Sequence, residues 1–276
     1  MAAKPSTIAG YSQPATELAE RVLLEVWSRL GDYRPHLVLV GGLVPRYLVP
    51  AMARIPVAQR HCGTMDVDLG ISLAVAELET YRSIRDTLVG RLGFRPAINA
   101  RGRQQRHSFV IDIEGTDVNI DFLTTRYQGP GDSLMREVEN ELSAIQVEGL
   151  GLALNEPLEI ALTGQRLAGG ITTETIRVCR PVPYLVLKAL AYERRREPKD
   201  AYDLVYVLTH HPSGPAALAA QIRTDERTAE SFQKALVSLR AHYASPNHDG
   251  PTDHARFVGD SAAMVPAFAA VQEFLR

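Results

Sequence analysis

Several features that would place this chain in a specialised class are missing from its sequence. No apolar run approaches the ~18 residues that a membrane-spanning helix needs. The first residues, MAAKPSTIAGYSQP, lack the apolar core of a signal peptide. We therefore expect a cytoplasmic protein without membrane contact, and we expect residues 1–13 to form a loose leader.

Cysteine is also scarce. Cys62 and Cys179 are the only two in the chain, and their separation does not match a metal knuckle. Two reduced thiols are the expected state, because a disulfide framework needs more cysteines at closer spacing. His61 and His107 could be grouped with Cys62 as zinc ligands, but their spacing is weak evidence for such a site.

Net charge is small as well. Lys and Arg number 30 against 32 Asp and Glu, which leaves a net charge of −2. This balance gives no general attraction to nucleic acid, so any affinity for it must come from local patches. Positive charge is concentrated in two arginine runs, at residues 101–106 and 194–196. These runs are either solvated faces or places where an RNA backbone is held.

The most informative stretch lies between residues 36 and 69. The apolar segment His36–Val40 reads as a strand, stops at Gly41 and Gly42, and is followed by a helix-like segment, Leu43–Ala51. A strand that passes through glycines into a helix leaves backbone N–H groups beside the loop, and these suit a phosphate. Arg46, one turn inside this helix, faces either a phosphate or the solvent.

Acidic and apolar residues alternate in the next strand, Thr64–Leu69. Side chains on a strand point to opposite faces with a period of two, so Asp66 and Asp68 share one face. Two carboxylates on one face can hold a divalent metal ion. They could also be solvated strand acids, but their coupling to the glycine pair and to Thr64 favours the metal.

A third carboxylate is expected on a hairpin. His107–Ile113 and Asp117–Leu123 read as its two strands. Asp121 lies on the polar face of the second strand, in a position like that of the aspartate pair. Asp112 is on the opposite strand and Asp117 is next to the turn, where aspartate is common for local reasons. Asp121 is therefore the preferred candidate.

These residues resemble the nucleotidyltransferase superfamily, in which a Gly-Gly turn opens a helix, a D-x-D strand follows, and a third carboxylate lies on a neighbouring strand. The pattern GG…R…H-x-G-T-x-D-V-D-L with a late Lys-Asp-x-x-Asp is similar to the AbiEii/AbiGii family of toxins from abortive-infection and toxin–antitoxin systems. One departure is that Gly42 and Asp66 are further apart than the compact superfamily spacing, with residues 50–63 as an apparent insertion.

The resemblance implies a chemistry and a set of residues. A pair of Mg²⁺ ions held by Asp66, Asp68 and Asp121 would support transfer of a nucleoside monophosphate from an NTP to an acceptor. It also implies a toxin that acts on RNA such as tRNA and has a cognate antitoxin. The alternatives are a nucleotidyltransferase of small molecules, as among antibiotic-modifying enzymes, and a non-catalytic binding protein of the same fold. The nucleotide-binding residues would be Gly41, Gly42, Arg46, Thr64, Lys188 and Lys199, and Asp203 would join the catalytic residues.

The late motif can also be interpreted from its own residues. Lys188 lies among apolar residues, where a lysine needs a partner or a ligand, and a triphosphate could supply its counter-charge. Asp200 and Asp203 are three apart on one predicted helix and so lie on nearly the same side. Asp200 follows Pro198 and is expected to cap this helix. We expect Lys188 and Asp203 to face the metal site. Asp203 would be the base for the acceptor hydroxyl, or it would merely pair with an arginine.

Periodicity predicts an α+β protein. A mixed β-sheet with flanking helices is expected over residues 1–180, and a helical domain over 181–276. Edge strands are expected at 145–147 and 176–178, around a short helix at 157–162, and a loop at 247–253. The expected longer helices are 15–30, 75–92, 183–196, 199–210, 216–223, 226–243 and 262–275.

Overall fold

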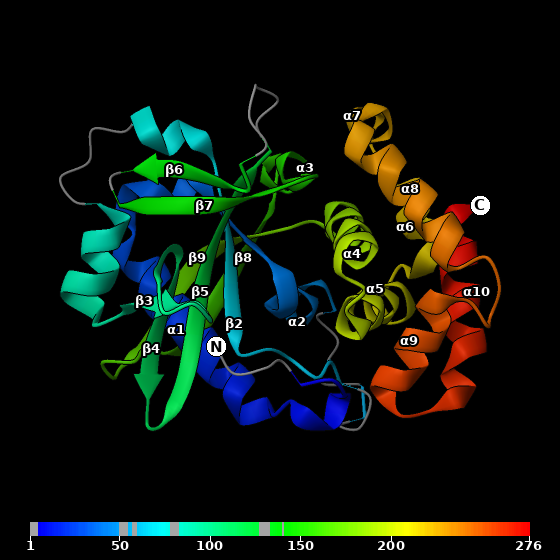
Figure 1. Cartoon of the computed structure of the whole chain (residues 1–276), viewed down its shortest axis with the longest axis horizontal. Coiled ribbons are helices and arrows are strands. Elements are labelled where there is room, and N and C mark those ends of the chain that lie inside the picture. Colours follow the sequence, from blue (N-terminus) through cyan, green and yellow to red (C-terminus); the bar gives the residue numbers. More distant parts are fainter. Residues whose placement is uncertain (1–4, 50–54, 57–59, 78–82, 127–132, 140) are drawn as a thin grey trace. The chain divides into compact units, whose positions relative to one another are not determined.

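The computed structural model describes residues 5–49, 55–56, 60–77, 83–126, 133–139 and 141–276, which form two compact units (Figure 1). The first unit is built mainly from Gln13–Leu43 and Gly63–Cys179. The second combines Lys4–Ser12, Val44–Cys62 and Arg180–Arg276. The second unit is therefore assembled from three separate stretches of the chain.

The first unit is organised around one mixed sheet. Seven strands follow the order β3-β4-β5-β2-β1-β9-β8, and β7 pairs with β5 and β6. The pairs β1/β9, β2/β5 and β5/β7 are parallel, and the other pairs are antiparallel. The strands are β1 (Leu37–Val40), β2 (Asp66–Ile71), β3 (Arg95–Ile98), β4 (Gln104–Ile113), β5 (Thr116–Thr125), β6 (Met135–Glu139), β7 (Leu142–Val147), β8 (Leu158–Gln165) and β9 (Ile171–Val178).

Burial patterns explain why β1, β2 and β5 form the centre of this sheet. All four residues of β1 are buried, as expected for an apolar strand covered on both faces. In β5 buried and half-buried residues alternate, with Val118, Ile120 and Phe122 fully buried. Helix α1 (Gln13–Arg29) packs against β2, β5, β8 and β9, and α3 (Leu150–Leu154) packs against β1, β2 and β5. The central strands are thus fixed by core packing, which also fixes where their polar residues lie.

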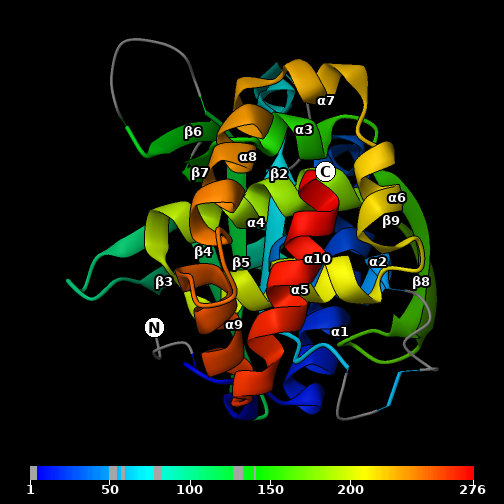
Figure 2. The ribbon, with the colours of Figure 1, turned by 90° about the vertical axis from the view of Figure 1, so that its right-hand side faces the viewer.

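The second unit is helical and has α5 at its centre. Every residue from Asp200 to Leu208 is buried, because α5 packs against α2, α4, α6, α9 and α10. Figure 2 shows α8, α9 and α10 outside α4 and α5. The helices of this unit are α2 (Pro45–Leu48), α4 (Pro181–Arg195), α5 (Pro198–His210), α6 (Gly214–Ala220), α7 (Thr224–Thr228), α8 (Glu230–His242), α9 (Asp249–Val258) and α10 (Met264–Leu275). Within the described residues, no helix has the length and apolar character needed to cross a membrane.

The predicted α+β class is confirmed, but one helix prediction and the edge placement of two strands are wrong. Residues 158–165 form β8 instead of a helix at 157–162, because they pair along their whole length with β9, and this pairing overrides the helix propensity of Leu, Glu and Ala. The short helix lies earlier, at α3. The predicted edge strands at 145–147 and 176–178 are both interior, since β7 lies between β5 and β6 and β9 lies between β1 and β8.

Two predictions in the helical region also need correction. The expected loop at 247–253 contains the first turns of α9, because Pro251 is tolerated in a first helical turn and Gly250 packs tightly on the ring of Tyr243. The helix expected at 226–243 is divided into α7 and α8 at Ala229, whose backbone is extended with φ −68° and ψ 131°.

Three further segments differ from the expectations. Residues 5–12 of the expected loose leader contain a 3-10 turn, Ile8–Gly10, and the ring of Tyr11 lies 5.9 Å from that of Phe257. The helix expected at 43–51 is confined to α2 within the described residues. The helix expected at 75–92 shows a 3-10 turn (Leu73–Glu77) and a π-helical segment (Asp86–Arg91), and residues 78–82 lie outside the description.

Candidate active site

The first unit brings the three predicted metal-binding aspartates to neighbouring strands. Asp66 and Asp68 alternate with buried Val67 on β2 and are themselves half-buried. Asp68 is in register with Asp121 on the parallel neighbour β5. Directly opposed residues on paired strands lie on the same face of the sheet. The expected placement of Asp121 beside the aspartate pair is therefore confirmed by strand register.

The glycine turn lies directly against this carboxylate group. Gly41 has φ +73°, and a Cβ at this position would overlap the carboxylate of Asp68. A Cβ on Gly42 would come within 2.9 Å of the Cβ of Thr64. Glycine is required at both positions for close approach, and at Gly41 for the backbone conformation too. The turn itself is a 3-10 segment, Gly41–Leu43, which follows directly from β1.

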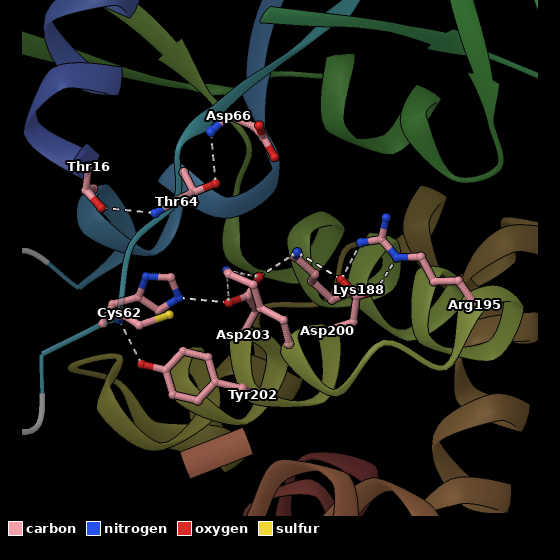
Figure 3. Close-up of polar contacts among 11 residues, drawn as sticks. Thr16, Cys62, Thr64, Asp66, Lys188, Arg195, Asp200, Tyr202 and Asp203 are labelled. Atoms are coloured by element: carbon pink, nitrogen blue, oxygen red, sulfur yellow. Dashed lines mark hydrogen bonds and ion pairs between the residues drawn. The ribbon is translucent and has the colours of Figure 1, made fainter. Parts of the chain in front are cut away.

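Thr64 links the start of β2 to the rest of the first unit. Its hydroxyl accepts a hydrogen bond from the Asp66 backbone N–H at 3.2 Å, and its own N–H donates to the Thr16 hydroxyl at 3.1 Å (Figure 3). Thr64 is buried. Thr64, which was predicted to bind the nucleotide, thus fixes the backbone that carries Asp66.

Asn119 is a residue of this face that the sequence-based selection missed. It is in register with Asp66, and its side-chain amide donates a hydrogen bond to Asp66 Oδ1 at 3.2 Å. Because it lies two residues before Asp121, strand alternation already placed it on the same face. An amide donor on one carboxylate oxygen fixes the orientation of that carboxylate.

The donor chemistry of this face fits Mg²⁺. Carboxylate oxygens are the ligands that Mg²⁺ prefers, and it needs only one or two of them because water and substrate phosphates complete its coordination. Asp66, Asp68 and Asp121 supply such oxygens. Among the described residues, no group of three or more His, Cys, Asp or Glu side chains is gathered closely enough to enclose a metal ion.

The two alternative aspartates of the hairpin lie elsewhere. Asp112 and Asp117 are paired with each other across β4 and β5, beside the Glu114–Gly115 turn, and both are exposed. Asp117 also forms a salt bridge with Arg95 at 3.2 Å. Their exposure and position at the hairpin end are those of solvated surface acids.

A separate group of charges lies between α4 and α5 in the second unit. Lys188 Nζ contacts Asp200 Oδ1 at 3.1 Å and Asp203 Oδ2 at 2.6 Å, so it bridges the two carboxylates (Figure 3). Arg195 contacts both oxygens of Asp200, at 2.5 and 2.7 Å. Lys199 Nζ lies 2.8 Å from Asp203 Oδ1. We call these five residues the ion cluster.

Burial makes these interactions strong. Asp200 is 1% exposed and Asp203 is fully buried. Burial raises the pKa of Asp203, but the charges of Lys188 and Lys199, with a hydrogen bond from His61, hold that pKa well below its usual range. Burial similarly opposes the charge of Lys199, yet Asp203 keeps the pKa of this lysine above its usual value. Asp203 and Lys199 are therefore both ionised at neutral pH.

The structure refines three expectations about this region. Asp200 does not cap α5, because the N-cap is Glu197 and the Asp200 carboxylate is bound to Lys188 and Arg195. The counter-charges of Lys188 come from the chain's own aspartates. Asp203 contacts lysines and a histidine instead of the arginine considered as its structural partner. The shared side of Asp200 and Asp203 is confirmed by Lys188, which contacts both.

His61 is the second residue that the sequence-based selection missed. Its Nε2 lies 2.9 Å from Asp203 Oδ1, and both side chains are fully buried. The ring stacks on Tyr202, with centroids 5.2 Å apart, and meets Tyr206 edge-on at 4.9 Å. Tyr202 also accepts the Cys62 backbone N–H at 3.0 Å. The only sequence signal was the place of His61 in the H-x-G-T pattern.

The predicted cationic residues differ in exposure and in whether they have an acidic partner. Arg46 is half-buried on α2, which packs against α5. In the run 194–196, Arg195 binds Asp200, and Arg196 binds Asp249 at 2.9 Å. In the run 101–106, all three arginines are exposed on and beside β4, and no ion pair within the described residues involves them. That Lys188 and Asp203 face the aspartates predicted to bind metal stays a prediction.

Comparison with known proteins adds one finding. A family model described as "Nucleotidyl transferase AbiEii toxin, Type IV TA system" matches residues 25–275. The matched range contains the glycine turn, the three aspartates and the ion cluster. No curated protein matches the chain, and no solved structure matches it.

Proposed function

The chain belongs to the AbiEii family of nucleotidyltransferase toxins from type IV toxin–antitoxin systems, and on this premise we propose that it transfers a nucleoside monophosphate from an NTP to RNA. In this reaction an acceptor hydroxyl oxygen attacks the α-phosphorus of the NTP. The bond from the α-phosphorus to the bridging oxygen breaks, pyrophosphate leaves, and the hydroxyl proton passes to solvent. A cognate antitoxin would limit this activity in the cell.

The observation that carries the proposal is the register of Asp68 with Asp121 beside the glycine turn. With Asp66, these carboxylates would hold Mg²⁺. When bound, the metal supplies positive charge that polarises the phosphate and stabilises the leaving pyrophosphate. Asn119 keeps the Asp66 carboxylate oriented, and Gly41 leaves room for the Asp68 carboxylate. The glycine turn also brings backbone N–H groups close to this face, where they can donate to phosphate oxygens.

The ion cluster supports nucleotide binding by its charge balance. Lys188, Arg195 and Lys199 are three cations against the two carboxylates of Asp200 and Asp203. The buried lysines and aspartates balance two against two, and the excess positive charge is that of Arg195, whose side chain is 45% exposed. A group with net positive charge attracts an anion as its further partner. A triphosphate is such an anion, so we assign the lysines of the cluster, together with Arg195, to phosphate binding.

Asp203 is better suited to positioning than to proton transfer. Its two oxygens accept from three donors, Lys188, Lys199 and His61. Because its pKa is held well below the usual range, its carboxylate is a weak base near neutral pH. We therefore propose that Asp203 holds the two lysines in place.

RNA is the proposed acceptor, with tRNA as the expected kind. The exposed arginines 101, 103 and 106 form an unneutralised basic patch on the β3–β4 hairpin. The run 194–196 is a weaker candidate, because two of its three arginines already have acidic partners. Cations in this setting bind RNA by releasing counterions from its phosphates.

Incubating the pure protein with Mg²⁺, each labelled NTP in turn and total RNA tests the proposal. Labelled RNA should appear with the wild-type protein, and chelation with EDTA should abolish it. Asp66→Asn, Asp68→Asn and Asp121→Asn should each reduce labelling by orders of magnitude, because each removes a charged metal ligand. Asp117→Asn is the matched control on the same hairpin and should label normally. Labelling of a small molecule but no RNA would reject RNA as the acceptor.

A growth experiment tests the toxin role. Expression of the wild-type chain should arrest bacterial growth, and Asp66→Asn, expressed to the same level, should not. Arrest by both proteins would show that toxicity does not depend on nucleotidyl transfer.

A further inference from the structure

A buried histidine contributes to the ion cluster from outside α4 and α5. His61 belongs to the segment Val44–Cys62, far from Asp203 in sequence, yet its Nε2 lies 2.9 Å from Asp203 Oδ1. Lys199 contacts the same oxygen at 2.8 Å. Lys188 contacts the other oxygen at 2.6 Å. The carboxylate is therefore held by donors from three different chain segments.

The surroundings of His61 fix its ring in one place. Tyr202 stacks on one face, and Tyr206 approaches edge-on. The ring is fully buried, and the charges that face it are those of Asp203, Lys188 and Lys199. Burial lowers the pKa of His61 to about 4, which outweighs the opposing effect of Asp203. The imidazole is neutral at physiological pH, and its Nε2 must carry the proton that it donates to Asp203.

We propose that His61 is a positioning residue, which holds the Asp203 carboxylate so that Lys188 and Lys199 are kept in the geometry that binds the nucleotide. This inference rests on the proposed function of the ion cluster. A neutral donor suits the task, because it adds a directional hydrogen bond without adding charge. The excess positive charge left for the nucleotide phosphates is then unchanged.

Substitutions at His61 separate the hydrogen bond from the packing. His61→Phe keeps an aromatic ring between Tyr202 and Tyr206 but removes the donor. His61→Gln restores an N–H at about the reach of Nε2. We expect His61→Phe to raise the Kd for a non-hydrolysable NTP analogue, measured by calorimetry, by about tenfold, the fold-change expected for loss of a hydrogen bond to a charged group. His61→Gln should recover most of that affinity.

His254 provides the matched control. It is also buried, burial lowers its pKa to about 4, and it stacks on Tyr202 at 6.0 Å, but within the described residues it forms no hydrogen bond with Asp203. His254→Phe should bind the analogue as the wild type does. Equal losses in His61→Phe and His254→Phe, or no loss in His61→Phe, would overturn the proposal. The proposal would also be overturned if His61→Gln bound the analogue as weakly as His61→Phe does, since the changed shape of the side chain alone would then explain the loss of affinity.

A spectroscopic measurement tests the same hydrogen bond without any activity or nucleotide. ¹⁵N NMR of the folded wild-type protein should show a neutral His61 imidazole with the proton on Nε2. A neutral ring protonated on Nδ1 would exclude donation to Asp203 and overturn the proposal. Because this measurement uses the wild-type protein, it decides the question even if His61→Phe fails to fold. If the wild-type protein binds no NTP analogue, the proposed function fails, and the NMR result still decides whether His61 orients Asp203.

Discussion

Gly41 lies so close to Asp68 that a single Cβ added at Gly41 would overlap the Asp68 carboxylate. The two residues lie on neighbouring elements, Gly41 directly after β1 and Asp68 on β2, whose strands pair antiparallel with Val40 opposite Asp68. The glycine therefore does more than turn the chain. It sets where one of the proposed metal ligands can lie.

Gly41→Ala should consequently abolish most nucleotidyl transfer. The substitution strains a backbone with φ +73° by about 1–2 kcal/mol and also displaces the Asp68 carboxylate. Gly93→Ala is the matched control, because Gly93 has φ +77° but nothing lies within 4 Å of its added Cβ. Melting temperatures and transfer rates of both variants should be compared. Equal transfer rates would show that the Gly41–Asp68 approach is irrelevant to activity.

Asn119→Ala should reduce the transfer rate by about tenfold while leaving the sheet intact, since it removes the amide hydrogen bond that orients the Asp66 carboxylate. Asn119→Asp should reduce the rate further, because it places a negative charge beside Asp66. Steady-state kinetics over a range of Mg²⁺ concentrations give the measurement. Wild-type kinetics in both variants would mean that Asp66 does not depend on its amide neighbour.

Stability should fall as the pH is lowered from about 6.5 to about 4. Burial lowers the pKa of His61 and of His254 to about 4, whereas an unfolded histidine titrates near 6.5. Between these values the unfolded chain binds more protons, so the free energy of unfolding decreases with falling pH, by on the order of 3 kcal/mol per imidazole. Below about 4 both states are protonated and this contribution is constant.

Urea unfolding at closely spaced pH values measures this slope. His254→Phe should remove one imidazole's share and flatten the curve across the same window. An unchanged slope in that variant would show that His254 titrates normally in the folded protein.

Lys188→Met should both destabilise the second unit and weaken nucleotide binding. It keeps the alkyl chain but leaves Asp200 and Asp203 without their shared cation, at a cost on the order of 3 kcal/mol. Arg195→Ala is the comparison: its side chain is 45% exposed and Lys188 still neutralises Asp200, so about 1 kcal/mol is expected. Thermal melts and calorimetry with an NTP analogue distinguish the two. Equal melting temperatures would contradict the bridging role of Lys188.

An RNA-binding prediction concerns the hairpin arginines. Replacing Arg101, Arg103 and Arg106 by glutamine should flatten the salt dependence of RNA binding, by about 0.7–0.9 in the log–log slope for each lost phosphate contact. Arg227→Gln combined with Arg240→Gln removes exposed charge elsewhere and should leave the slope unchanged. An unaltered slope in the hairpin variant would locate the RNA elsewhere.

Local periodicity was sufficient to predict that Asp66, Asp68 and Asp121 share one face of the sheet. The alternation around Asp66 and around Asp121 assigns each to a face without knowledge of the partner strand, and the structure adds only the register between them. The family resemblance seen in the motifs is confirmed by the family match. Asn119 lay on the same face, but the search was for a third carboxylate, so its amide was not selected.

Features that depend on distant pairing could not be predicted in this way. Residues 157–162 were predicted to form a helix, and pairing with β9 makes residues 158–165 a strand. His61 and Asp203 are joined by burial across a long stretch of chain, and no local pattern reports such a contact. Lys188 was recognised as needing a partner, but its two aspartates were visible only once α4 was packed on α5.

The second unit is assembled from separate segments of the chain, and this affects the order in which its parts are synthesised. Val44–Cys62 leaves the ribosome long before α4 and α5 exist, so His61 and Cys62 emerge without Asp203 and Tyr202, their later partners. The ion cluster and its histidine donor can form only after the chain has been translated past Asp203. A nascent or prematurely terminated chain that ends between Asp121 and Cys179 carries all three aspartates proposed to bind metal but lacks both lysines proposed to bind the nucleotide. Translation itself therefore delays the appearance of the complete set.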